Sequence, residues 1–245
     1  MNLVLFESAE LQDGRLRLRG RRAEHIKKIL RLEVGDTLRV GMVNGKMGRG
    51  VILAVDNALV EVEPLLDVDP PPVPDVELIL ALPRPIMLKR ILKQATVLGV
   101  RGIHLLRSAK VEKSFFHSPV LQPDTMRSLV QEGLEQAVDT RHPEITLHHR
   151  FKPFVEDVLP ELSGKRLIAH PGCATCLSRA LPAGERGESI ILAIGPEGGW
   201  NDFEMECFIR QGFTGFSMGG RILHVDTAVV ALLAQLQILR ESDHG

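Results

Sequence analysis

The stretch that decides the fold is IILAIGPEGGWNDFEMECFIRQGFTGFSMGGRILHVD, which spans residues 190–226. It begins with five apolar residues, 190–194, whose length and β-branching are typical of a buried strand. The strand is expected to end at Gly-Pro-Glu-Gly-Gly, residues 195–199, a loop with almost no side chains.

A helix and a second strand are expected after this loop. Asn201, with Glu204 three residues later, predicts a helix start, and Gly212 predicts its end. Residues 214–218 predict a short strand, and a second glycine loop follows them. Glycine loops at the carboxyl ends of strands are where an open α/β sheet binds small ligands, because the backbone can approach the ligand closely.

Two common classes of phosphate site are not expected. The chain has no Gly-Lys-Ser/Thr loop, which excludes a nucleotide P-loop. It also has no G-x-G-x-x-G that opens a helix in an early βαβ unit, which argues against a dinucleotide fold. The ligand is therefore expected to be something other than a phosphate.

Composition limits the class of protein. The formal net charge of the 245 residues is −1, from 30 Lys and Arg against 31 Asp and Glu, so only the distribution of charge can point to a partner. Three cysteines, no signal peptide and no apolar run of membrane-spanning length predict a soluble, cytoplasmic protein without a membrane partner. Aromatic residues make up only 4 %, which argues against a base-stacking surface.

The N-terminal part is predicted to consist of short strands joined by turns. Asn44-Gly45 is a hairpin signal, and residues 23–30 are the one helical candidate. The expected strands are residues 3–6, 16–18, 37–40, 50–55 and 59–62. This pattern predicts a small β-barrel.

The same part carries an excess of positive charge. Residues 15–49 hold eleven basic and only three acidic side chains. Such a face is expected to bind RNA phosphates with an affinity that falls with salt, and a solvated surface balanced by acids elsewhere is the alternative. The candidate RNA contacts are Arg17, Arg19, Arg21, Arg22, Lys27, Lys28 and Arg31.

Residues 67–75, DVDPPPVPD, predict a stiff linker and hence a domain boundary. Strands and helices alternate beyond it, which predicts an α/β domain with a mainly parallel sheet covered on both faces. The expected strands are 76–82, 102–106, 144–148 and 167–170, and the expected helices are 88–98, 123–138 and 153–162. We therefore expect two domains, at residues 1–69 and 75–245.

The C-terminal residues 225–239 predict a long helix that is apolar over most of its surface. A helix of this kind must be buried. Its cover is either its own domain or a partner subunit, and the sequence does not separate the two.

Several motifs occur in a fixed order and together resemble the RsmE family of ribosomal RNA methyltransferases, whose usual strings are IGPEGG and LGPRILR-x-ETA. The resemblance covers nearly the whole chain. The motifs are IGPEGG at 194–199, MGGRILHVDTA at 218–228, H-x-x-x-I-L-R-L-x-V-G-D at 25–36, A-L-P-R at 81–84, A-T-x-L-G-V at 95–100 and E-Q-A-x-x-T-R-x-P-E-I at 135–145.

This resemblance implies a PUA-like N-terminal β-barrel that binds RNA and a C-terminal SPOUT domain whose last strands and helix form a trefoil knot. It implies a homodimer that transfers a methyl group from S-adenosyl-L-methionine to N3 of a uridine in small-subunit (16S) ribosomal RNA. The expected partner is this RNA or the assembled small ribosomal subunit, and no metal is implied.

By the same resemblance, three loops hold the cofactor. Glycine-bearing loops present backbone amides and carbonyls freely, which suits adenine and ribose. Ordinary turn glycines, and a helix-start carboxylate at Glu197, are the alternatives. The implied cofactor contacts are His170, Pro171, Gly172, Ile194, Gly195, Pro196, Glu197, Gly198, Met218, Gly219, Arg221, Ile222, Leu223 and Thr227.

Methylation at N3 of uridine requires loss of the N3 proton as the methyl group arrives. Catalysis therefore needs a group that stabilises the uracil anion or accepts the proton. Arg221 is the candidate for the anion, and Asp226 is the candidate base unless it only caps the last helix with Thr227. Arg84 and Arg141 are further candidate RNA contacts, with an ordinary surface arginine as the alternative for Arg141.

Cys173 and Cys176 form a C-x-x-C pair three residues after His170, a spacing that in isolation indicates a redox or zinc site. A fourth ligand is missing unless Cys207 joins them, and the family needs no metal. We therefore expect two small thiols and no metal site.

Several residues depart from the family strings. Asp226 replaces a usual Glu and keeps the carboxylate on a shorter stem, and Gln94 replaces a usual Lys. His224 replaces the usual Arg, Gly220 the usual Pro and Val97 a usual Glu. These departures favour one alternative function, an RNA-binding assembly factor that has lost catalysis. A SPOUT enzyme that methylates a ribose 2′-OH is the alternative within the same class.

Overall fold

The structure is a computed structural model that describes residues 2–241, which form two compact units. The first unit contains the chain up to Val73 together with Val130–His142. The second contains Pro74–Leu129 and the chain from Pro143 onward. No helix within residues 2–241 is long and apolar enough to cross a bilayer.

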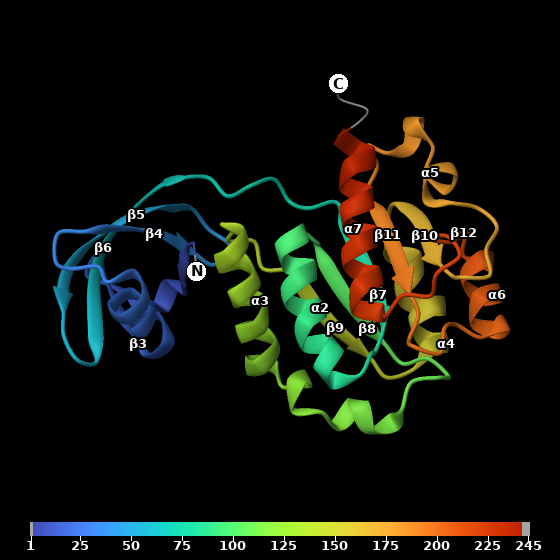
Figure 1. Cartoon of the computed structure of the whole chain (residues 1–245), viewed down its shortest axis with the longest axis horizontal. Helices are drawn as coiled ribbons and strands as arrows, with labels where there is room; N and C mark the ends of the chain where they lie inside the picture. The colour runs from blue at the N-terminus through green and yellow to red at the C-terminus, as the bar shows by residue number, and fades with distance from the viewer. Residues whose placement is uncertain (1, 242–245) are drawn as a thin grey trace. The chain divides into compact units, whose positions relative to one another are not determined.

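The first unit is built on a curled six-stranded sheet with the order β1-β4-β5-β6-β3-β2 (Figure 1). Only β1 and β4 pair in parallel. The strands are β1 Val4–Phe6, β2 Leu11–Gln12, β3 Arg15–Arg19, β4 Thr37–Met42, β5 Met47–Val55 and β6 Leu59–Val68. Helix α1, Gly20–Glu24, continues as a wide helical turn over His25–Leu30.

All five predicted N-terminal strands are present, and Asn44, with a φ of 56°, turns β4 into β5 as expected. The sheet is nevertheless open, because β1 and β2 lie at its two edges and are three and two residues long. The predicted small β-barrel is therefore an open, curled half-barrel. The predicted linker also begins later, because β6 includes Asp67 and Val68.

Residues 130–142 belong to the first unit because of the E-Q-A-x-x-T-R motif. The Glu135 carboxylate is buried, pairs with Arg21 at 2.7 Å and accepts the amide of Leu5 at 3.4 Å. The fully buried Thr140 donates its hydroxyl to the carbonyl of Gly45 at 2.6 Å. The motif therefore fastens this segment to the curled sheet.

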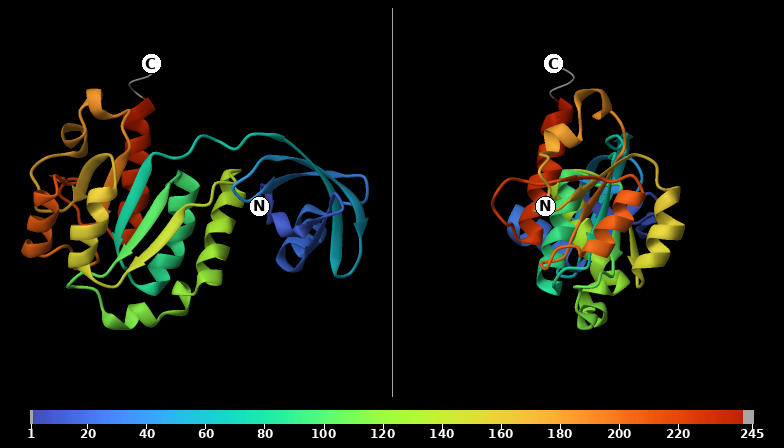
Figure 2. Two further views of the ribbon diagram at one scale, coloured as in Figure 1. Left: turned by 180° about the vertical axis from the view of Figure 1, so that it is seen from behind. Right: turned by 90° about the vertical axis from the view of Figure 1, so that its right-hand side faces the viewer.

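The second unit contains a six-stranded sheet in which every neighbouring pair is parallel, as predicted, with the order β12-β10-β11-β7-β8-β9. Helices cover both faces (Figures 1 and 2). The strands are β7 Val76–Ala81, β8 Gly102–Leu106, β9 Glu144–His148, β10 Lys165–Ala169, β11 Ile190–Ile194 and β12 Thr214–Phe216. The helices are α2 Pro85–Leu98, α4 Phe151–Pro153, α5 Leu177–Ala180, α6 Asp202–Arg210 and α7 Val225–Glu241. Helix α3, Pro123–Ala137, begins in this unit and passes at Val130 into the first.

Local sequence signals fix several of these bounds. Asn201 and Glu204 form the predicted reciprocal capping box at the start of α6, and Gly212 follows its end with a φ of +82°. The helix expected over residues 153–162 is present as one helical segment. It begins as α4, widens to a π-helix over Phe154–Val158 and tightens to a 3₁₀ turn over Leu159–Glu161. The short helix α5 was not expected.

The C-terminal helix α7 is covered within its own unit. Its side chains Val225, Val229, Leu232, Leu233 and Leu236 are buried, and it packs against α2 and β11. The sequence left open whether its own domain or a partner subunit covers α7. The buried face of α7 is covered by its own domain.

A row of polar groups crosses the sheet from β7 to β9. Arg101 donates to Glu77 at 2.9 Å, and His104 lies 3.5 Å from the same carboxylate. The other ring nitrogen of His104 lies 3.1 Å from Nε2 of His148. Burial, with His104 and His149 nearby, lowers the pKa of His148 to about 4.

This pKa predicts a loss of stability in mild acid. The unfolded chain binds a proton at His148 near pH 6.5 and the folded chain only near pH 4, so the free energy of unfolding falls as the pH drops between these values. We expect a loss of about 1 kcal/mol between pH 7 and pH 5 for this half-buried group. Urea unfolding at both pH values should show it, and His148→Gln should remove most of it. An equal loss in both proteins would contradict the assignment.

Candidate functional site

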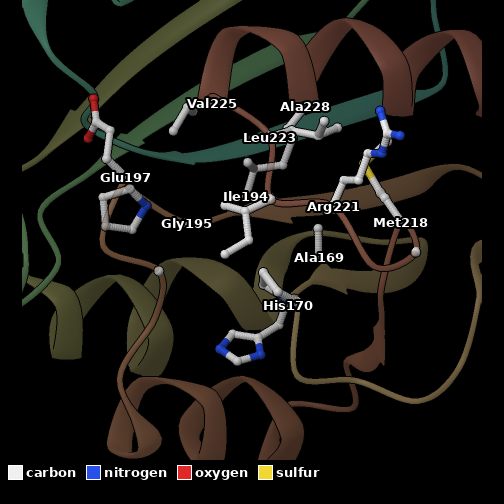
Figure 3. A pocket seen from close by; sticks show the side chains of 15 residues that line it. Ala169, His170, Ile194, Gly195, Glu197, Met218, Arg221, Leu223, Val225 and Ala228 are labelled. Carbon is white, nitrogen blue, oxygen red and sulfur yellow. The ribbon is translucent and has the colours of Figure 1, made fainter.

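A pocket lies at the carboxyl ends of β10 and β11, beside the start of α7 (Figure 3). Its hollow contains about 690 Å³ of empty space, part of it open to solvent. The lining residues are Ala169, His170, Pro171, Ile194, Gly195, Pro196, Glu197, Gly199, Met218, Gly219, Arg221, Ile222, Leu223, Val225 and Ala228.

The loop after β11 can take its shape only because it is rich in glycine. Gly199 has a φ of +67°, a conformation that other residues adopt at a cost. A Cβ at Gly195 would lie 3.2 Å from the backbone and ring nitrogens of the buried Trp200, so there is little room for a side chain. Lys110, on the loop after β8, donates to the carbonyl of Gly198 at 2.7 Å and fixes the far side of the loop.

Glu197 and Arg221, both in the pocket lining, differ in their contacts with the rest of the protein. In Figure 3, Glu197 and Arg221 lie at opposite ends of the pocket, with Ile194 and Leu223 between them. The Glu197 carboxylate accepts the backbone amide of Arg84 at 3.1 Å. Arg221, in contrast, forms no hydrogen bond or ion pair with residues 2–241, so its guanidinium is available to a ligand.

Asp226, at the start of α7, has two partners. Its Oδ2 lies 3.3 Å from Nη1 of Arg90 on α2, and its Oδ1 accepts the amide of Thr227 at 3.0 Å. The carboxylate is mostly buried. These contacts are those of a helix-start residue that also joins α7 to α2.

His170 is held in one orientation at the edge of the pocket. Its Nδ1 accepts the amide of Gly172 at 3.0 Å, so Nε2 carries the proton of the neutral ring. The backbone amide of His170 donates to the carbonyl of Phe216 at the end of β12. The loop after β10 is thereby joined to the second glycine loop.

The structure brings together most of the residues predicted to hold the cofactor. Eleven line the pocket, and three, Gly172, Gly198 and Thr227, are not in its lining. Ala169, Gly199, Val225 and Ala228 line it but were not predicted. Once the start of the helix is known, the position of Ala228 in the lining can be predicted from that of Val225, because residues three apart share a helix face. No sequence signal pointed to Lys110 or Arg90, whose partners are distant in the chain.

The predicted RNA contacts of the first unit are largely engaged within the protein. Arg17 pairs with Glu61, Arg21 with Glu135, Arg22 with Glu10 and Lys28 with Glu24, and Lys27 donates to two backbone carbonyls. Arg19 and Arg31 form no ion pair with the described residues. Arg39 and Arg49 lie directly opposite one another on β4 and β5, also without a carboxylate partner in the described chain. Two like charges in this position repel one another.

The remaining two predicted RNA contacts lie outside this sheet. Arg84 precedes α2, and its side chain is exposed. Arg141 donates its Nε to the carbonyl of Pro71.

The three cysteines are free thiols. Burial raises the pKa of Cys173, and hydrogen bonds, chiefly from Ser178, lower that of Cys176. Within residues 2–241, no three His, Cys, Asp or Glu side chains are grouped as a metal site.

The parallel sheet and its glycine-loop pocket define an α/β protein with a small-ligand site at the carboxyl edge of the sheet. Residues 69–237 match the family described as RNA methyltransferase domain. The chain is 34 % identical to ribosomal RNA small subunit methyltransferase E of Treponema pallidum, over 96 % of this chain and 90 % of that protein. It is 29 % identical to the protein of the same name from Synechocystis, over 89 % of this chain and 71 % of that one.

A solved structure has the same fold. The crystal structure of ribosomal RNA small subunit methyltransferase E from Neisseria gonorrhoeae, bound to S-adenosyl methionine, covers 97 % of this chain and 98 % of its own, with a TM-score of 0.77 and 20 % identity. The chain therefore belongs to the RNA methyltransferase family and, within it, to the family of ribosomal RNA small subunit methyltransferase E.

The loop geometry predicts the effect of adding one methyl group. Gly199→Ala should lower the free energy of unfolding by about 1–2 kcal/mol, because alanine is strained at a φ of +67°. Gly187→Ala is the matched control, since its Cβ would meet nothing within 4 Å and its φ is not positive. Urea unfolding should place the control within about 0.5 kcal/mol of the parent protein. Equal stability of both variants would refute the strained loop.

Proposed function

We propose that the chain transfers a methyl group from S-adenosyl-L-methionine to N3 of a uridine in small-subunit (16S) ribosomal RNA. One observation carries the proposal. The segment that matches the RNA methyltransferase family, residues 69–237, contains both glycine loops, and these loops line one pocket. The names of the related proteins supply the substrate class.

The residues of the pocket fit the proposed cofactor. Ile194, Met218, Leu223 and Ala228 give an apolar surface suited to an adenine ring, and the glycine loops leave room for the ribose. Gly195 packs against the buried Trp200 with little room for a side chain, which holds the first glycine loop in place beside the pocket. When bound, the cofactor supplies an electrophilic methyl group on a sulfonium. We propose the three loops of the sequence prediction as its contacts, including Gly172, Gly198 and Thr227 at their margins.

Arg221 is proposed as the principal catalytic residue. The reaction forms the bond from N3 to the methyl carbon, breaks the bond from that carbon to sulfur, and releases the N3 proton. Negative charge grows on the uracil as the proton leaves, and a guanidinium without a carboxylate partner can stabilise it. Asp226 is the second candidate, as acceptor of the proton, although its contacts with Arg90 and Thr227 also explain its presence.

The first unit is proposed as the RNA-binding domain, PUA-like, at residues 1–69. Because several of the predicted basic residues pair internally, we assign RNA phosphates first to Arg19, Arg31 and the opposed pair Arg39 and Arg49. The other predicted contacts would then extend this surface or hold its arginines in place. They are Arg17, Arg21, Arg22, Lys27, Lys28, Arg84 and Arg141.

Residues 75–245 are proposed as a SPOUT methyltransferase domain with a trefoil knot. In support, β10 lies between β11 and β12, so the chain must pass the loop after β10 to return from β12 to α7. A parallel bridge between Cys176 and Ser217 shows the two segments in contact there. We also propose a cytoplasmic homodimer that acts on the small ribosomal subunit, and the exposed Ile222 beside the pocket supports a covering partner.

The direct test is incubation of the protein with labelled S-adenosyl-L-methionine and undermethylated small ribosomal subunits, followed by nucleoside digestion and mass spectrometry. We expect 3-methyluridine, formed about a hundredfold more slowly by Arg221→Ala at saturating cofactor. Arg179→Ala, an exposed arginine that does not line the pocket, should keep the parent rate.

Two results would overturn the proposal. A 2′-O-methylated nucleoside without 3-methyluridine would establish the ribose enzyme instead. RNA binding without any methyl transfer would favour the assembly factor and would make the departures at His224 and Gly220 its explanation.

A further inference from the structure

A second depression lies at the carboxyl edge of the same sheet, after β8 and β9 and beside the start of α6. The residues that matter to its chemistry are Arg107, Ser108, Arg150, Phe151, Lys152 and Phe203, and we call it the β8–β9 depression. It shares no lining residue with the pocket described above. The two are joined by the glycine loop, because Gly199 lines the pocket and Asn201 lines the depression.

Hydrogen bonds hold the walls of the depression in place. The amide of Arg107 donates to the carbonyl of His148 at 2.9 Å. This hydrogen bond joins the ends of β8 and β9. The buried Glu204 of α6 accepts the amide of Ala109 at 2.6 Å and that of Asn201 at 3.0 Å. The only carboxylate in the lining is thus directed at backbone amides and is unavailable to neutralise the cations around it.

The depression is positively charged. Arg107 and Arg150 line it and have no carboxylate partner in the described chain. Lys152, also in the lining, pairs only with the exposed Glu156, at 3.7 Å. The hydroxyl of Ser108 is buried and has no hydrogen-bond partner among the described residues, which costs about 1–3 kcal/mol unless a ligand or water supplies one. Arginines without carboxylate partners, in the same depression as a free hydroxyl donor, fit a phosphate group.

Two aromatic side chains lie beside these cations. Phe203 is 48 % exposed, although it is one of only nine phenylalanines in a chain poor in aromatic residues. Phe151 lies with its ring centroid 6.3 Å from that of Phe203 and is braced edge-on by Phe208 at 5.5 Å. An exposed ring in the same depression as arginines without carboxylate partners is a combination that can bind an unpaired nucleotide, by its base and its phosphate together.

We propose that the β8–β9 depression binds an unpaired nucleotide of the RNA strand that carries the target uridine. Arg107 and Arg150 hold its phosphate, and its base stacks on Phe203. That the strand is the one with the target uridine rests on the proposed function. It places a second contact with the RNA in the second unit, in addition to the basic surface of the first.

The test measures binding of a fluorescein-labelled single-stranded RNA to the full chain by anisotropy, over a range of salt. The double variant Arg107→Gln/Arg150→Gln should weaken binding and reduce the slope of log affinity against log salt by about 0.7, the value for one lost phosphate contact. Phe203→Ala should weaken binding roughly five- to 150-fold and leave the slope unchanged. Arg179→Gln is the matched control and should leave both quantities unchanged.

Activity separates this proposal from the proposed function. In the double arginine variant and in Phe203→Ala, the affinity for S-adenosyl-L-methionine, measured by calorimetry, should stay at the parent value, and only KM for small ribosomal subunits should rise. In the control Arg179→Gln neither quantity should change. If the parent protein transfers no methyl group but the variants still lose RNA affinity as described, the proposed function fails and the depression stands.

Three results would overturn the depression as an RNA site. The first is parent-like RNA affinity and KM in the arginine and phenylalanine variants. The second is absence of RNA binding by the parent protein. The third is full competition by millimolar inorganic phosphate, which would identify a site for free phosphate instead of a strand.

Discussion

The position of β10 between β11 and β12 is the constraint on which the candidate site depends. Because all three strands are parallel, their carboxyl ends lie at one edge, and the loops that leave them must share the same space. Glycine suits these loops for two reasons. Gly199 and Gly219 have φ values of +67° and +95°, and a Cβ at Gly195 or Gly198 would lie close to Trp200 or Lys110. The pocket is what remains between these loops and the start of α7.

Acidic side chains at this edge serve mainly as acceptors for the backbone. Glu197 accepts the amide of Arg84, Glu204 accepts amides from two segments, and Asp226 accepts an amide while it pairs with Arg90. The arginines that line the two hollows are consequently left without carboxylates. A chain with a net charge of −1 can thus present a positively charged edge of its sheet to RNA, because the acidic side chains there bind backbone amides and hold the loops in place.

The sequence predicted those features that are set by neighbouring residues. The apolar run of β11 and the reciprocal bonds of Asn201 and Glu204 gave correct bounds, and the order of motifs indicated the family. Features set by distant residues were missed. The positive surface of the first unit was overestimated because Glu61 and Glu135, which neutralise Arg17 and Arg21, lie outside the basic window. For the same reason neither the open edges of the first sheet nor the role of Lys110 could be predicted.

The central claim is that the glycine loops and α7 enclose the site of S-adenosyl-L-methionine. Ala228 tests it most directly, since it lines the pocket from the helix and leaves both loops untouched. Titration calorimetry should find one cofactor bound per parent chain and no measurable binding to Ala228→Phe, whose circular dichroism should match the parent. Equal affinity in the two proteins would contradict the account, because the cofactor would then bind elsewhere.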